Sequence, residues 1–184
     1  MRAGAFAGYA SIFHRVDRGG DRVLPGAFAR SIARRGARGI RLLWQHDPAS
    51  PIGVIDEIAE DGRGLFVRGR LLLDVARGQE AHALLSAAAI DGLSIGYRAV
   101  VAERDRDGVR NLREIDLWEV SLVTFPMQPA ARVAALAHGA KGTRAPAEMR
   151  AAAEPGWTEV LRSVAALTAR ISADLPDISS NTGA

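Results

Sequence analysis

Short apolar segments separated by turn-forming residues constrain the fold of this chain more than any other feature. The clearest pair, Ile52–Ile58 and Leu65–Leu73, is joined by Glu60-Asp61-Gly62-Arg63-Gly64, a sequence typical of a hairpin loop. Aromatic, β-branched and leucine residues, bounded by Gly, Asp and Pro, predict further strands over residues 5–14, 40–46, 93–102 and 109–124.

Two helices are predicted between these strands. One follows Pro25 and stops at Gly36, and the other, rich in Ala and Leu, covers Gln79–Ile90 and ends at Asp91-Gly92. Strands and helices do not alternate as they do in βαβ units. The chain is therefore predicted to be α+β and mostly β, with a small closed or partly open β-barrel flanked by short helices.

The C-terminal part of the chain has a different composition. Residues 139–155 hold Gly, Lys, Thr, Pro and Ala without a strand pattern, which predicts a linker. Apolar residues then recur at helical spacing, which predicts an amphipathic C-terminal helix over 156–175, followed by a disordered tail over 176–184. Residues 1–138 are predicted to form the one folded domain.

Composition excludes several kinds of site. The chain has 184 residues, of which 48% are hydrophobic, and it has no cysteine, so disulfides, thiolate metal sites and cysteine nucleophiles are excluded. No pair among the four histidines has metal-ligand spacing, so neither a metal nor a cofactor is expected. No secretory signal and no apolar run of about 20 residues is present, so we expect an intracellular protein that does not enter a membrane.

Arginine supplies nearly all of the positive charge, and Lys141 is the one lysine. The net charge is only +3, and the arginines are spread along the chain. The densest group has no aromatic residue within it before Trp44, which favours a solvated helix face over a specific nucleic-acid site; it comprises Arg30, Arg34, Arg35, Arg38 and Arg41.

A serine, a histidine and a carboxylate occupy three of the predicted strands. Ser94 lies in a short apolar run after the second helix, His46 ends an earlier apolar run, and Glu119 interrupts a later one. Together they are the minimum parts of an activated hydroxyl nucleophile. A lone histidine is more often a packed or surface residue, so the weight of His46 comes from its companions. Asp47-Pro48 is expected to end its strand at a loop.

The strand period of two places Glu119 on a face that is otherwise apolar except for Ser121. An unpaired buried carboxylate is costly or becomes protonated, so Glu119 requires a partner. Either a histidine or one of the many arginines could supply it, and the sequence leaves both open. Glu114 and Asp116 lie next to a polar stretch and are expected to be solvated.

The surroundings of Ser94 argue against one common hydrolase fold. Gly92-Leu93-Ser94-Ile95-Gly96 has the spacing of a nucleophile elbow, but here a helix precedes the serine and a strand follows it, which is the reverse of the elbow's order. Gly96 shares a strand face with Ser94, and its missing side chain is expected to leave space for a substrate backbone.

Five segments, in this order, resemble the HK97-type prohead proteases, the capsid-maturation proteases of tailed phages. They are residues 8–13 (Gly-Tyr-Ala-Ser-Ile-Phe), 21–28 (Asp-Arg-Val-Leu-Pro-Gly-Ala-Phe), 44–47 (Trp-Gln-His-Asp), 92–97 (Gly-Leu-Ser-Ile-Gly-Tyr) and 119–126 (Glu-Val-Ser-Leu-Val-Thr-Phe-Pro). The resemblance covers about residues 5–133. It implies a herpesvirus-assemblin-like fold and a serine endopeptidase activity.

The resemblance also implies roles for individual residues. Ser94 would attack the scissile carbonyl, His46 would take the proton of Ser94 and return it to the leaving amine, and Glu119 would orient the imidazole. Glu114 is the nearest rival for the third position, which is a histidine in the related viral assemblins.

The resemblance to this family also implies a substrate and a place of action. The major capsid protein with its scaffolding segment would be the substrate, cleaved inside the assembling prohead in the host cytoplasm. Self-cleavage in the linker and a homo-oligomeric state are also expected. Three alternatives stay open: a non-catalytic capsid-assembly scaffold or chaperone with a protease-like barrel, an esterase that uses the same side chains, and a nucleic-acid binder.

Overall fold

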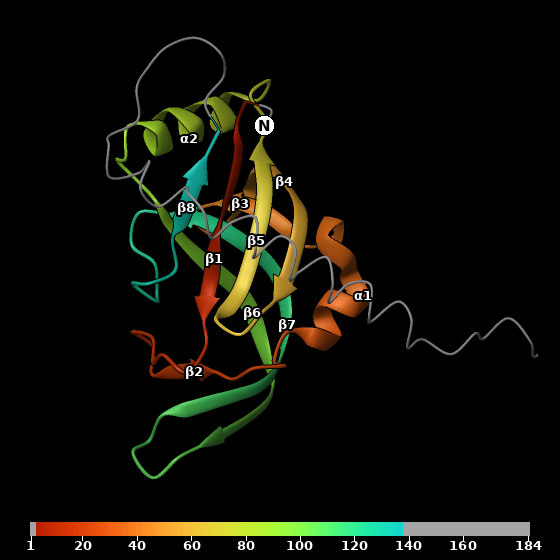
Figure 1. The fold of residues 1–184 in the computed structure, drawn as a ribbon, viewed down its shortest axis with the longest axis vertical. Helices are drawn as coiled ribbons and strands as arrows, with labels where there is room; N and C mark the ends of the chain where they lie inside the picture. Colours follow the sequence, from red (N-terminus) through yellow and green to blue (C-terminus); the bar gives the residue numbers. More distant parts are fainter. Residues whose placement is uncertain (1–2, 138–184) are drawn as a thin grey trace, which may run out of the picture. The chain divides into compact units, whose positions relative to one another are not determined.

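The computed structural model describes residues 3–137 of the chain. These residues form eight strands and two helices, seen in Figure 1. In chain order the elements are β1 (Ala5–Ile12), β2 (Asp21–Val23), α1 (Ala29–Gly39), β3 (Arg41–Trp44), β4 (Asp47–Glu60), β5 (Gly64–Leu71), α2 (Ala76–Ser86), β6 (Gly92–Arg104), β7 (Arg110–Val123) and β8 (Val133–Leu136).

All the strands of the described residues belong to one curled sheet. Its order is β2-β7-β3-β4-β5-β1-β8, and β6 pairs with β7 outside that path. The pairs are antiparallel except for β2 and β3, which both run parallel to β7. An isolated bridge between Gly92 and Arg132 joins the start of β6 to the segment before β8. The predicted mostly β, partly open barrel with few short helices is therefore confirmed.

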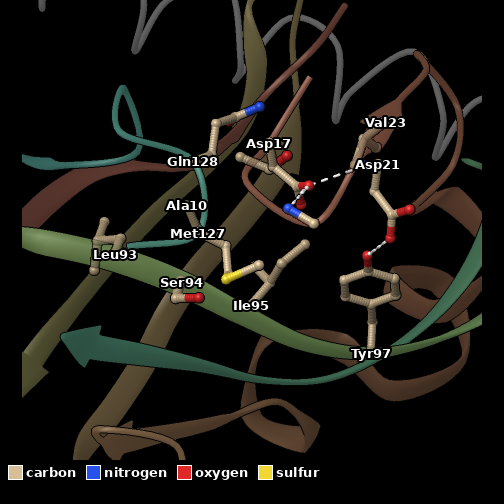
Figure 2. Close-up of a pocket in the computed structure, with 12 residues that line it drawn as sticks. Ala10, Asp17, Asp21, Val23, Leu93, Ser94, Ile95, Tyr97, Met127 and Gln128 are labelled. Carbon is tan, nitrogen blue, oxygen red and sulfur yellow. Dashed lines mark hydrogen bonds between the residues drawn. The ribbon is translucent and has the colours of Figure 1, made fainter. Parts of the chain in front are cut away.

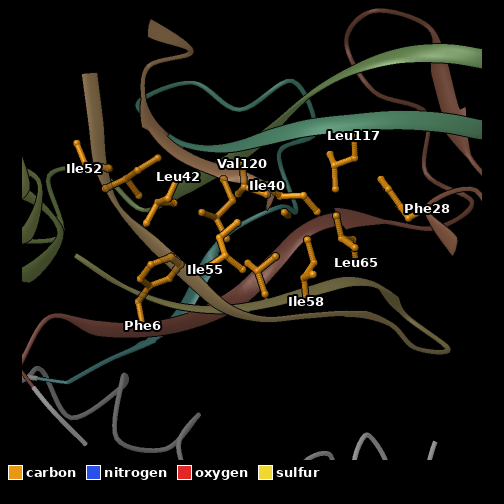
Figure 3. Packing of buried hydrophobic residues seen from close by; sticks show 14 of the residues in the cluster. Phe6, Phe28, Ile40, Leu42, Ile52, Ile55, Ile58, Leu65, Leu117 and Val120 are labelled. Carbon is orange, nitrogen blue, oxygen red and sulfur yellow. The ribbon is translucent and has the colours of Figure 1, made fainter. Parts of the chain in front are cut away.

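The core fills the inside of the curled sheet (Figure 3). It takes large apolar side chains from β1, β3, β4, β5, β7 and the N-terminal side of α1, among them Phe6, Leu42, Ile55, Leu65, Leu117 and Phe28. Burying apolar area is the main favourable term in folding. The packing of β3 and β7 on this common core determines where the polar residues of these two strands lie.

The two helices lie outside the sheet. Helix α1 packs against β4 and β7, and α2 packs against β4 and β5. Gly36 has a left-handed backbone with φ of 60°, which interrupts α1 at the glycine where a stop is predicted. Helix α2 starts and ends a few residues earlier than predicted. Neither helix is long and apolar enough to cross a membrane, and the described residues contain no other helix.

Several boundaries differ from those predicted. Strands β2 and β8 are not predicted, because three or four residues are too few to show a periodic pattern. Strand β4 begins at Asp47, five residues before the predicted start at Ile52, and β3 ends at Trp44. The predicted linker, C-terminal helix and tail lie outside the described residues.

Candidate active site

His46 lies at the tip of the β3–β4 hairpin in a two-residue turn. Trp44 pairs with Asp47, so Gln45 and His46 are the turn residues, and their φ angles are 51° and 63°. A two-residue hairpin turn of type I′ requires positive φ at both positions, and such turns usually take Asn and Gly. Residues with a side chain cost about 1–3 kcal/mol each in such a conformation and persist only where their surroundings hold them. The prediction that His46 ends a strand is therefore wrong, because the turn carries it.

Four hydrogen bonds attach this turn to the end of β7. The backbone N–H of Gln45 donates to the carbonyl of Leu122 at 3.0 Å, and the N–H of His46 donates to Oγ of Ser121 at 3.0 Å. The Gln45 side chain donates through Nε2 to Oγ1 of Thr124 at 2.7 Å and accepts the Thr124 N–H at 3.3 Å. These bonds offset the strain of the turn and locate the imidazole beside β7.

The imidazole of His46 pairs with the carboxylate of Glu119 on β7. Nδ1 of His46 lies 2.6 Å from Oε1 of Glu119. The Glu119 side chain is 9% exposed and the His46 side chain is 42% exposed, so the carboxylate is buried beneath a reachable imidazole. The hydrogen bond to Glu119 raises the pKa of His46 above its ordinary value, against the opposing effect of partial burial. The partner of Glu119 is thus a histidine and not an arginine.

Two neighbours fix the position of the Glu119 carboxylate. The hydroxyl of Ser121 donates to Oε2 at 2.6 Å, so both carboxylate oxygens are hydrogen-bonded. Gly96 pairs with Glu119 across β6 and β7, and a Cβ at position 96 would overlap the carboxylate. The expectation that Gly96 leaves space for a substrate backbone is therefore wrong, because Glu119 fills that space.

Ser94 lies on β6 directly opposite Ser121 of β7. Because side chains two residues apart share a strand face, Ser94 projects on the side of β6 where Gly96 meets Glu119. Opposed residues of antiparallel strands have Cβ atoms about 4.5–5.5 Å apart, so Ser94 faces the Ser121–Glu119 pair. Ser94 is 4% exposed, and within residues 3–137 its hydroxyl has no hydrogen-bond partner.

The two other carboxylates of β7 lie elsewhere. Glu114 is five residues from Glu119, about 16 Å along a strand, and it pairs with Arg30 of α1 at 3.3 Å. Asp116 is buried, with its carboxylate bonded to Arg34 and Arg35 of the same helix. The expectation that Asp116 is solvated is therefore wrong, because α1 packs over this part of β7.

A cavity of about 210 Å³ has Ser94 in its wall (Figure 2). Its apolar lining includes Leu93 and Met127, and its polar lining includes two carboxylates. Asp17 accepts two backbone N–H groups of its own loop, and Asp21 accepts the Tyr97 hydroxyl at 2.6 Å. The cavity therefore borders β6 at Ser94 and lies between this strand and the segment that carries Asp17 and Asp21.

Three features of the site are not predicted from the sequence. The first is the role of Ser121, although its spacing of two from Glu119 places both on one face. The second is the contact of Gly96 with Glu119, and the third is the Gln45–Thr124 clamp, whose partners are far apart in the sequence. Among the described residues, no three or more His, Asp or Glu side chains are grouped to hold a metal.

The solved structures that are similar to this chain include two viral proteases. The capsid assembly protease of bacteriophage T4 superposes with a TM-score of 0.51 at 14% identity, over 70% of this chain and 79% of the T4 chain. The protease of varicella-zoster virus gives a TM-score of 0.48 at 15% identity, over 94% of this chain and 90% of that one.

Comparison of sequences gives the family. The prohead protease of Enterobacteria phage HK97 is 34% identical over 140 residues, which are 73% of this chain and 61% of the HK97 protein. The chain thus matches less than two thirds of that relative's length. The family described as caudovirus prohead serine protease matches residues 2–145. The chain is therefore a member of the caudovirus prohead serine protease family.

Proposed function

We propose that this chain is a serine endopeptidase in which Ser94 is the nucleophile, His46 the general base and Glu119 the residue that orients the imidazole. The observation that carries this proposal is the His46–Glu119 hydrogen bond on the strand face that Ser94 shares. Family membership supports the reaction class, and the contacts of these side chains support their roles.

The chemistry follows from the two nitrogens of the imidazole. Nδ1 is held by Glu119, so in the neutral ring Nδ1 carries the proton and Nε2 is the base. Nε2 takes the proton of Ser94 as Oγ attacks the scissile carbonyl, and it returns this proton to the leaving amine. A water molecule then hydrolyses the acyl-enzyme by the same route. Buried Glu119 stabilises the imidazolium that forms in each step.

The proposed substrate is the scaffolding segment of the major capsid protein, cleaved inside the assembling prohead in the host cell. The HK97 relative is a prohead protease and the T4 relative in structure is a capsid assembly protease, which supports this place of action. We include self-cleavage and a homo-oligomeric state in the proposal. Enclosure in a prohead would raise the local substrate concentration, so a modest affinity would suffice.

Ser94→Ala tests the proposal. We expect the wild-type chain, co-expressed with its cognate capsid protein, to shorten that protein, and Ser94→Ala to leave it intact, because the nucleophile is lost. Intact-mass spectrometry reports the cleavage site and self-processing in one measurement. Ser86→Ala removes the hydroxyl of an exposed serine on α2 and is expected to cleave as the wild type does.

Other outcomes select the alternatives. If the capsid protein has the same mass with the wild type as with Ser94→Ala, the chain is the non-catalytic assembly scaffold. Hydrolysis of small esters without cleavage of any peptide indicates an esterase.

A further inference from the structure

We propose that Ser121 is a positioning residue of the active site, whose hydroxyl locks the His46 turn and the Glu119 carboxylate into one arrangement. This inference rests on the proposed function of Ser94, His46 and Glu119. It assigns a role to a serine that neither attacks substrate nor transfers a proton to it.

The two hydrogen bonds of Ser121 join the parts of the site. Its Oγ accepts the backbone N–H of His46 at 3.0 Å and donates to Oε2 of Glu119 at 2.6 Å. A hydroxyl has one proton to donate, so the direction of each bond is fixed: the backbone N–H can only donate, and the carboxylate accepts. One side chain therefore controls both the backbone that carries the base and the carboxylate that orients it.

The strain of the turn gives the first of these bonds its importance. Gln45 and His46 both have positive φ without being glycine. Such a turn relaxes unless its surroundings hold it. The Ser121 hydroxyl supplies the hydrogen bond to the His46 N–H itself, whereas the Gln45–Thr124 clamp acts one residue earlier.

The second bond fixes the rotation of the carboxylate. Oε1 of Glu119 faces Nδ1 of His46, and Oε2 is held by Ser121. Without the Ser121 hydroxyl, the Glu119 side chain keeps one anchor instead of two. The carboxylate is then free to rotate away from the imidazole.

Ser121 is not placed as a nucleophile. It is 0% exposed, and its proton is engaged by Glu119. Ser94 lies opposite it and lines the cavity, which Ser121 does not. The proton of Ser121 is therefore occupied, whereas the Ser94 hydroxyl has no hydrogen bond within residues 3–137.

Among the described residues, a carboxylate determines the electrostatic surroundings of the His46 imidazole. Glu119 of β7 makes the contact with the ring. Asp47, the next residue along the chain, is turned away, because its carboxylate accepts from the Ala49 N–H and the Ser50 hydroxyl. A change in the titration of His46 in a Ser121 variant therefore reports on the His46–Glu119 pair.

Ser121→Ala tests the inference by two independent readouts. We expect kcat/KM to fall about 10²-fold, the effect of misplacing a catalytic group by about 1 Å. We also expect the pKa of His46, followed by NMR titration of its ring and assigned with His46→Gln, to fall towards its ordinary value. The acid limb of the pH profile should move to lower pH by the same amount.

Ser31→Ala is the matched control. Ser31 is another buried serine whose hydroxyl donates to backbone carbonyls, those of Phe28 and Ile115, away from the site. Ser31→Ala removes a buried, hydrogen-bonded Oγ, as Ser121→Ala does, so the two variants lose the same kind of interaction. We expect the titration of His46 and the pH profile to stay as in the wild type.

Ser121→Thr keeps the hydroxyl and is expected to restore both readouts to within a few-fold. If its extra methyl group prevents folding, the Ser121→Ala titration decides by itself. An unchanged or raised His46 pKa in Ser121→Ala, or an effect equal to that of Ser31→Ala, overturns the inference. A folded wild-type chain that cleaves nothing overturns the proposed function instead, while the titration still tests the role of Ser121.

Discussion

At the residue scale, the site depends on two amino acids in a backbone conformation that neither prefers. Gln45 and His46 form the kind of turn that Asn-Gly forms in ordinary hairpins. The turn exposes the imidazole edge while Nδ1 remains tied to a buried carboxylate. Strain held by neighbouring hydrogen bonds is a recurrent feature of active sites, because it fixes a side chain that would otherwise move.

Glu119→Gln tests the pairing at this scale. In the proposed mechanism His46 is the general base and acts in its neutral form, so activity should rise as the pH passes the pKa of His46, which Glu119 raises. Removing the carboxylate charge lowers this pKa, so the acid limb of kcat/KM should move to lower pH. The plateau should fall about 10²–10⁴-fold, because the imidazolium loses its stabilising charge.

The pH dependence of peptide cleavage checks this prediction, with Glu114→Gln as the control. Glu114 lies far from Glu119 along β7 and pairs with Arg30 of α1. Its substitution should therefore leave the acid limb and the plateau of kcat/KM unchanged. If the acid limb moved in Glu114→Gln and not in Glu119→Gln, Glu119 would not be the residue that orients the imidazole.

At the element scale, the β4–β5 hairpin and α1 support each other through Glu60. This residue ends β4, and its carboxylate accepts the Phe28 N–H at 2.8 Å and the Gly26 N–H at 3.1 Å, just before α1 begins. Burial raises the pKa of Glu60 despite these two bonds. The same helix covers β7 through the Asp116 ion pairs, so its placement bears on the strand that carries Glu119.

Glu60→Ala is expected to destabilise the fold by about 1–2 kcal/mol, since two N–H groups lose their acceptor. Glu60→Gln keeps one acceptor oxygen and should cost less. The folded pKa of Glu60 is above its unfolded value, so wild-type stability should decrease as pH rises through that folded pKa. Urea unfolding at several pH values measures both the loss of stability in the variants and the pH dependence of the wild type. If Glu60→Gln had the same pH dependence of stability as the wild type, Glu60 would not be its cause.

At the scale of the whole molecule, β7 is the strand on which the fold and the site depend together. It pairs with β2, β3 and β6, and it carries Glu119 and Ser121 beside the buried Leu117 and Val120. The pairing of β3 with β7 brings the His46 turn to the C-terminal end of β7. The pairing of β6 with β7 brings Ser94 to the same end. A change in the core under β7 should therefore reach the site.

Leu117→Ala is expected to lower the free energy of unfolding by about 2–5 kcal/mol, because it leaves a cavity in the core. Leu84→Ala makes the same chemical change at a partly exposed position of α2 and should cost about 1 kcal/mol or less. Chemical denaturation compares the two. Equal losses would show that Leu117 does not lie in the core as described.

The sequence by itself determined the elements whose signals are local. Residues 61–63 join β4 to β5 as the Asp-Gly pattern predicts, and Gly36 interrupts α1. Turn chemistry and strand periodicity act over a few residues, so they can be interpreted without the fold. The same local patterns singled out Ser94, His46 and Glu119 as candidates, and together with the resemblance they pointed to the family.

Only the tertiary structure decided which of these side chains meet. Strand register set Ser94 opposite Ser121 and placed the Glu119 carboxylate over Gly96. The packing of α1 on β7 paired Glu114 with Arg30. The Gln45–His46 turn has no glycine or asparagine to reveal it, and its hydrogen bonds reach residues 75–79 positions away. Register and long-range hydrogen bonds depend on how the core packs, and a change of register by one residue would turn every side chain of a strand to the opposite face.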